Sequence, residues 1–253
     1  ACREHAAEFE TAYGHLIRSV PVNIYAVAEA DSLVDFDTYT HVLRGEIDFT
    51  AVRPETYGLR HVEGAIFCNE RHIVIGKARE HFERVLAGRL HLRQKPGAVD
   101  DARWPLTIDC TFCAHEGAGI DRYEPCITAL LKGPTDRAVT IMDGPFPSLY
   151  PWDEEKGLSS LTSASLTPFS KSCRTWGEAR QILDDMPATA RRARANAMVD
   201  QMAYFYPRIR DSYRVAGFKM SIRAQPRSGA DARLCDMVVI SSRAVRIRAG
   251  KID

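Results

Sequence analysis

The sequence has no long apolar run, no signal-peptide core and almost no net charge, and each absence excludes a class of protein. Its apolar stretches are far shorter than the roughly 20 residues that a membrane-spanning helix needs. Lys and Arg number 34 against 33 Asp and Glu, so no excess positive charge attracts nucleic acid or an anionic membrane. We therefore expect no nucleic-acid partner and no membrane span.

Cysteines do not form the regular pattern of a disulfide framework or a metal cluster. They are odd in number and irregularly spaced, which is typical of a cytoplasmic chain with reduced thiols. They are Cys2, Cys68, Cys110, Cys113, Cys126, Cys173 and Cys235. Cys110 and Cys113 have the C-x-x-C spacing of a redox pair or half a zinc site, but no second pair exists and the motif follows a predicted strand. We expect no metal here, and a thiol-redox or zinc protein is the weakest alternative.

Motifs of common enzyme classes are missing as well. No G-x-G-x-x-G follows a predicted strand, and Gly117-Ala118-Gly119 lacks the third glycine of that loop. No G-x-S-x-G elbow and no H-E-x-x-H pair occur, so hydrolase and metalloprotease chemistry have no support. Nucleotide binding therefore cannot be derived from a motif in this sequence.

Hydrophobic periodicity predicts an α+β fold with a large mixed, mostly antiparallel sheet flanked by helices, because strands outnumber helices and do not alternate with them strictly. Helices are expected over residues 3–18, 32–43 with Ser32 as N-cap, 77–86, 175–186 and 189–206. Strands are expected over residues 22–28, 47–52, 62–68, 90–93, 106–111, 123–131, 138–142, 158–166, 213–222 and 237–245. The two strands around the turn at residues 133–136 are expected to pair with each other.

Residues 143–152 (DGPFPSLYPW) hold three prolines and three aromatic residues. The plain interpretation is a rigid connection between two strands. The functional interpretation is one wall of a ligand cavity, because aromatic rings and fixed backbone suit pockets. Tyr150 then lies at the edge of that pocket.

This segment opens an ordered series that resembles the substrate-domain sheet of FAD-dependent oxidoreductases of the D-amino-acid-oxidase-like superfamily. The series continues with GLSSLTS (157–163), LTPF (166–169), YFYP (204–207), SIRA (221–224), DARL (231–234) and RAGKID (248–253). The resemblance runs over most of the chain and is densest from Thr107 to Asp253.

The resemblance implies two interleaved domains. Residues 1–75 would form the first part of the substrate domain, and residues 76–111 a remnant of the Rossmann-like FAD domain. Residues 112–240 would complete the substrate domain, and residues 241–253 would return toward the FAD domain.

Cofactor contacts are carried over in the same way. Cys110 and Thr111 would approach FAD at a strand end, although Phe112 stands where the family usually has glycine. Gly250, Lys251 and Ile252 would approach the flavin from a backbone turn and a helix start, whose N–H groups favour negative charge on the reduced ring. The family's glycine loop would precede Ala1, so we expect a truncated chain that carries mainly the substrate domain and binds FAD weakly or not at all.

An acidic substrate would need an arginine clamp, because a guanidinium binds a carboxylate through two parallel hydrogen bonds. Arg223 and Arg233 are the candidates, with Tyr150 at the pocket edge. Alternation over residues 219–224 places Met220 and Ile222 on an apolar face and Arg223 on the opposite, polar face. The equally weighted alternative is a structural salt bridge, for example with Asp231.

The leading hypothesis is therefore an FAD-dependent oxidoreductase that removes hydride from an amine or a related C–H donor. The main alternative is a binding or interaction module without enzymatic activity.

Overall fold

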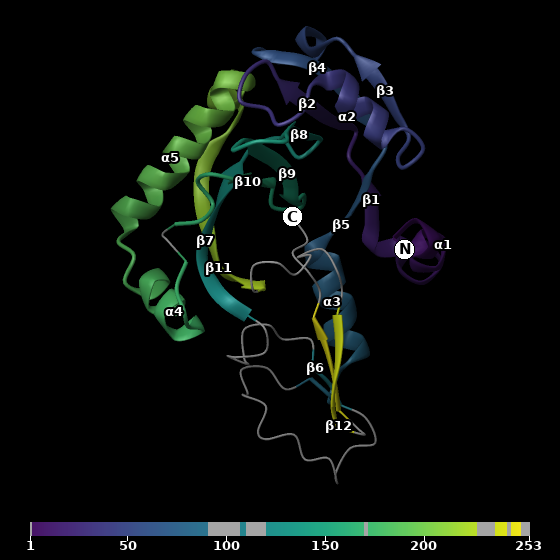
Figure 1. Cartoon of the computed structure of the whole chain (residues 1–253), viewed down its shortest axis with the longest axis vertical. Coiled ribbons are helices and arrows are strands. Elements are labelled where there is room, and N and C mark those ends of the chain that lie inside the picture. Colours follow the sequence, from purple (N-terminus) through teal and green to yellow (C-terminus); the bar gives the residue numbers. More distant parts are fainter. Residues whose placement is uncertain are drawn as a thin grey trace. The chain divides into compact units, whose positions relative to one another are not determined.

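The computed structural model describes residues 2–90, 107–109, 120–169, 172–226, 236–241 and 244–248. Its largest element is an eight-stranded mixed sheet (Figure 1). In spatial order the strands are β11 (Arg214–Pro226), β7 (Ile120–Lys132), β10 (Leu158–Ser163), β9 (Pro147–Asp153), β8 (Arg137–Met142), β2 (Val22–Ala28), β4 (Val62–Cys68) and β3 (Phe49–Val52). Strands β2 and β8 pair in parallel, whereas β7–β10, β10–β9, β9–β8, β2–β4 and β4–β3 are antiparallel. This arrangement confirms the expected α+β class and largely antiparallel sheet.

The two faces of this sheet differ in chemistry. Residues that pair across strands share a face, and one cross-strand row is entirely apolar and buried. It consists of Ile24, Val139, Leu149, Leu161 and Ala129. The neighbouring row points to the opposite face, is only half-buried and consists of Tyr25, Thr140, Ser148 and Thr162. Strand β10 therefore alternates between half-buried and buried residues over its whole length, and β9 does so over its first six residues.

Helices complete the core from both sides. Helix α5 (Ala188–Phe205) packs on β9 and β10 and buries Met198, Met202 and Phe205 (Figure 1). Helix α2 (Phe36–Leu43) packs on β2 and β4, where its Tyr39 joins a cluster with Val27, Ile66 and Cys68. Register places these sheet residues on the same face as Tyr25, so α2 covers the β2–β4 end of the polar face.

The chain divides into two compact units, and each consists of three separate stretches. The first contains Ala1–Ala87, Ile127–Thr167 and Pro187–Lys219. Within it, α1 (Cys2–Tyr13) and η1 (Gly14–Leu16) precede β1 (Ile17–Ser19), which pairs with β5 (Arg71–Ile73). The remaining elements of this unit are η2 (Pro54–Tyr57), α3 (Ile75–Val85) and α6 (Ile209–Ser212).

The second unit contains Gly88–Cys126, Pro168–Met186 and Met220–Asp253. Helix α4 (Trp176–Asp184) contributes buried Ala179 to a cluster with Tyr123, against which Ile222 and Ala224 pack. A three-stranded sheet has the order β12 (Asp236–Ser241), β13 (Ala244–Arg248) and β6 (Thr107–Asp109). Strand β13 pairs in parallel with β6 and in antiparallel fashion with β12.

Several sequence expectations are confirmed, and β2 and β4 have the predicted bounds. Others are wrong. The strands on either side of residues 133–136 are not neighbours, because β10 and β9 lie between β7 and β8. Residues 237–245 form parts of two strands rather than one, and the N-cap of α2 is Asp35 rather than Ser32. The strand expected at residues 90–93 lies almost wholly outside the described residues.

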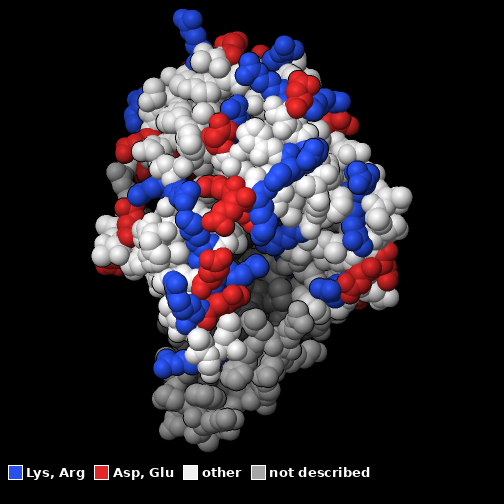
Figure 2. Space-filling model, turned by 180° about the vertical axis from the view of Figure 1, so that it is seen from behind, with Lys and Arg blue, Asp and Glu red and all other residues white. Residues whose placement is uncertain are grey.

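Charged side chains show no separation by sign on the face in Figure 2, where Lys and Arg alternate with Asp and Glu. This mixture agrees with the formal net charge of +1. Among the described residues, no helix is long and apolar enough to cross a membrane.

Candidate functional site

The polar row of the large sheet is the principal candidate site. Its side chains come from β2, β8, β9 and β10, and the Thr140 and Ser148 hydroxyls are hydrogen-bonded at 2.8 Å. Ser160 on β10 faces the same way, since it pairs with Tyr150, and its Oγ donates to the Tyr150 carbonyl at 3.2 Å. Half-buried hydroxyls in a row can offer several hydrogen bonds to one small ligand.

A tyrosine and a glutamate define the end of this row. The Tyr25 hydroxyl on β2 donates to Oε2 of Glu70, which follows β4 directly. Burial and this contact raise the pKa of Tyr25 well above its usual range. The phenol therefore stays protonated and continues to donate to the carboxylate.

Tyr150 lies next to this pair on the same face. Burial, and then the Glu70 charge, raise the pKa of its phenol, while a polar contact with Asn23 acts in the opposite direction. Asn23 is 0% exposed, yet neither of its amide atoms reaches hydrogen-bond geometry with a partner among the described residues. The contact between Asn23 and Tyr150 is therefore close, but its geometry is poor for a hydrogen bond. A buried amide without good hydrogen bonds is costly unless a ligand completes them.

A second carboxylate, that of Glu154, is linked to Tyr150 through His72. His72 on β5 meets the Tyr150 ring edge to face, with 6.0 Å between centroids. Its Nε2 lies 3.3 Å from Glu154, which also accepts a hydrogen bond from Arg18 at 2.9 Å. This chain of contacts fixes the position of His72 and, through it, the Tyr150 ring.

Arg223, the expected substrate clamp, is bound to a carboxylate of the protein. Its Nε donates to Glu124 Oε2 at 2.9 Å, and Nη2 contacts the same oxygen. The side chains of Arg223 and Glu124 are 30% and 17% exposed, so this ion pair is partly buried. The apolar neighbour Ile222 packs on the cluster that α4 forms with Tyr123. Arg223 and Tyr150 lie in different units of the chain.

The other predicted site residues lie outside the described part of the chain. These are Arg233, Cys110, Thr111, Gly250, Lys251 and Ile252, together with Cys113 and Asp231. The strands that precede the cofactor candidates are described: β6 ends at Asp109 and β13 ends at Arg248. Since β6 and β13 are parallel and Arg246 pairs with Asp109, both strands end at the same edge of their sheet.

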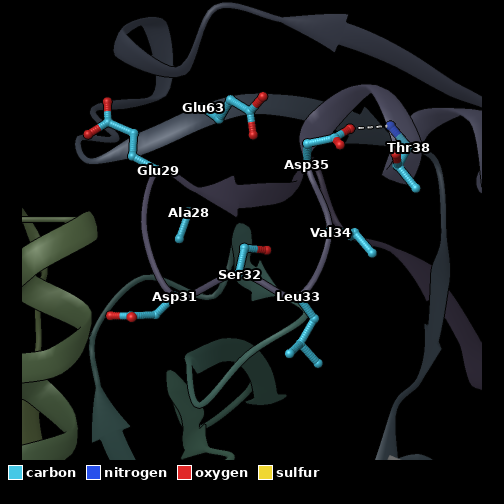
Figure 3. A pocket seen from close by; sticks show the side chains of 9 residues that line it. All are labelled: Ala28, Glu29, Asp31, Ser32, Leu33, Val34, Asp35, Thr38 and Glu63. Carbon is cyan, nitrogen blue, oxygen red and sulfur yellow. Dashed lines mark hydrogen bonds between the residues drawn. The ribbon is translucent and has the colours of Figure 1, made fainter.

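A separate hollow of about 370 Å³ lies between β2, β4 and the start of α2 (Figure 3). Four carboxylates line it, from Glu29, Asp31, Asp35 and Glu63. Figure 3 shows that they do not converge on one point. The Asp35 carboxylate accepts from Thr38 N at 2.6 Å and Glu63 accepts from Phe36 N at 3.1 Å, so two of the four hold the start of α2.

Sequence analysis found Tyr150 but missed Tyr25, Asn23, Glu70 and His72. Tyr25 and Asn23 lie in the strand VNIYAVA, in which Asn23 is the one polar residue, so an amide within an apolar strand was the signal that could have found this site. Glu70 follows a buried strand, which is a usable signal, because loops at strand ends carry functional residues. No local pattern shows that Tyr25, Glu70 and Tyr150 come from three adjoining segments of one face.

Comparison with known proteins identifies the family. No protein-family model matches the chain. A curated relative, the FAD-dependent monooxygenase FPY4 of Fusarium mangiferae, is 31% identical over 264 residues, which cover 99% of this chain and 70% of the relative. The fold is similar to glycine oxidase from Geobacillus kaustophilus, with a TM-score of 0.59 and 11% identity over 98% of this chain and 71% of that one.

L-proline dehydrogenase from P. horikoshii has a similar fold too, with a TM-score of 0.62 and 9% identity over 97% of this chain and 71% of that one. Both solved structures match the large sheet and the helices that cover it, and the curated relative matches in sequence as well. The resemblance stated from the sequence is therefore confirmed: the chain belongs to a family of FAD-dependent oxidoreductases, and it shares the fold of glycine oxidase and L-proline dehydrogenase.

Proposed function

We propose that the polar face of the large sheet binds the substrate of a flavin enzyme that oxidises an amine or a related C–H donor. The observation that carries this proposal is the half-buried row of hydroxyls beside Asn23, a buried amide whose hydrogen bonds are incomplete. FAD, when bound, supplies the acceptor for the hydride. The residues of the row orient the substrate, exclude water and hold protons at the Tyr25 and Tyr150 hydroxyls.

The cofactor would be held at the other sheet. Ligands bind outside the carboxyl ends of parallel strands, and β6 and β13 end together directly before the segments that contain Cys110-Thr111 and Gly250–Ile252. This supports the assignment of residues 76–111 and 241–253 to the FAD domain, with the remainder as substrate domain. The described residues contain no glycine-rich turn that opens a helix for a pyrophosphate, so they fit the flavin end of FAD rather than its phosphates.

Arg223 and Arg233 remain proposed contacts for an acidic substrate. We further propose a cytoplasmic location, which is supported by the odd number and irregular spacing of the cysteines.

Oxygen insertion is a second candidate, because the curated relative is named a monooxygenase. Anaerobic mixing of the full-length flavoprotein with small amines separates the two reactions. We expect flavin bleaching by an amine without oxygen, and release of the corresponding imine or carbonyl product. Flavin that is reduced only by a nicotinamide, followed by a hydroxylated product in air, would show the monooxygenase reaction instead.

A further inference from the structure

Glu70 carries a negative charge that no positive group of the described residues neutralises. Among the described groups whose pKa is clearly shifted, the Glu70 charge acts on Tyr25, Tyr39, Cys68 and Tyr150, which are all acids, and it raises the pKa of each. No salt bridge to Glu70 occurs within the described part of the chain.

The cations closest to Glu70 in sequence are bound to other carboxylates. The guanidinium of Arg71, the next residue, pairs with Glu10. His72 faces Glu154, which also pairs with Arg18. These cations are therefore already paired with other carboxylates, and none of them pairs with Glu70.

The geometry around Glu70 suits a ligand. Its Oε2 accepts the Tyr25 hydroxyl, and no hydrogen bond to Oε1 occurs among the described residues. Glu70, Tyr25 and Tyr150 are all half-buried, so they are accessible and yet partly shielded from water. A carboxylate in such a place gains most from a charged partner that also donates hydrogen bonds, and aromatic rings beside it attract cations too.

We propose that Glu70, held by Tyr25 and flanked by Tyr150, binds the ammonium group of a cationic substrate. The inference deepens the proposed function and rests on it, because it assigns the charge of the substrate at the polar face. The Tyr25 hydroxyl positions the carboxylate, and the free oxygen accepts an N–H of the ligand. Asn23, on the same face, provides further polar atoms close to Tyr150.

Calorimetry on the full-length flavoprotein tests this with two probes of matched shape, benzylammonium and benzyl alcohol, at neutral pH. We expect benzylammonium to bind about tenfold or more tightly than the alcohol, the ratio that one charge-assisted contact supplies. Glu70→Gln keeps the shape and removes the charge, so it should bring this ratio close to one. Tyr25→Phe keeps the charge and should preserve the preference for the cation with weaker binding overall.

Glu46→Gln is the matched control, because Glu46 is exposed and its side chain makes no hydrogen bond or ion pair within the described residues. The ratio should therefore stay at the wild-type value. Thermal unfolding and flavin content show whether each variant is folded. An equal affinity of wild type for both probes, or a preference that survives Glu70→Gln, overturns the proposal. Anaerobic flavin reduction by benzylamine is measured separately, so a cation site without amine oxidation would contradict the proposed function and not the role of Glu70.

Discussion

Cys68 ends β4 fully buried, and burial followed by the nearby Glu70 charge raises the pKa of its thiol to about 12. The thiolate, not the thiol, reacts with alkylating agents. The environment therefore makes Cys68 an inert core residue beside the polar face, in spite of its position next to candidate site residues.

We expect Cys68 to resist iodoacetamide in the folded protein at mildly alkaline pH and to react fully after denaturation, as mass spectrometry of its peptide can show. The raised pKa also means that the unfolded chain releases this proton first. The stabilising effect of the buried neutral thiol is complete below its unfolded pKa near 9 and is lost as the pH rises toward about 12. Rapid alkylation of Cys68 in the native state would contradict this environment.

Arg223 can stabilise the protein, bind the substrate or do both, and one substitution separates these roles. Arg223→Lys keeps a charge for Glu124 but loses the planar fork that a carboxylate prefers. If Arg223 binds an acidic substrate, we expect this variant to raise KM, because the loss of the bidentate contact costs about 1.5–3 kcal/mol of binding free energy. The midpoint of unfolding should change little. A lowered midpoint with an unchanged KM would show that Arg223 is structural.

At the scale of elements, β9 explains why the sequence could be only partly interpreted. Its prolines indicate a turn, and we expected a rigid connection over residues 143–152. The structure has a central strand instead. Pro147 is its first residue, and Pro151 pairs with Ser159 next to an irregularity of the ladder. Prolines are tolerated in sheets at such positions, where no ladder hydrogen bond is lost.

Strands rich in apolar residues, such as β2 and β4, were predictable because most of their positions are buried and this favours an apolar composition. Strand partners were not, because the pairing of Val22 with Arg137 depends on residues far apart in the chain. The same limit applies to the site. Tyr150 could be predicted because it belongs to an aromatic-rich segment, whereas Glu70 could not, because its role depends on its contact with Tyr25, which is distant in sequence.

Gly64 shows how closely α2 approaches the sheet. A Cβ at this position would lie 2.4 Å from the Phe36 ring. We expect Gly64→Ala to destabilise the protein by about 1–3 kcal/mol, the usual cost of overpacking. Chemical denaturation measures the change, and Phe36→Leu in the same chain should recover part of it. Equal losses in the single and double variants would indicate that the ring moves aside freely.

At the scale of the whole molecule, the function requires more than the large sheet. The 253-residue sequence contains no G-x-G-x-x-G loop, whose backbone N–H groups would hold the FAD pyrophosphate. We therefore expect this chain, expressed by itself, to purify without colour and to remain colourless after incubation with FAD and gel filtration. A stoichiometric flavin absorbance spectrum in this chain would show that other residues supply the phosphate contacts.

The interleaving of the two units has a consequence for synthesis on the ribosome. Strand β4 can pair with β2 early, but β8, which pairs with the other edge of β2, is synthesised only after the whole first half of the chain. Until then β2 presents unpaired backbone groups beside apolar side chains, a surface on which nascent chains associate. The order of translation, and not only the final stability, thus determines how long the early β2–β4 pair remains open to association with other nascent chains.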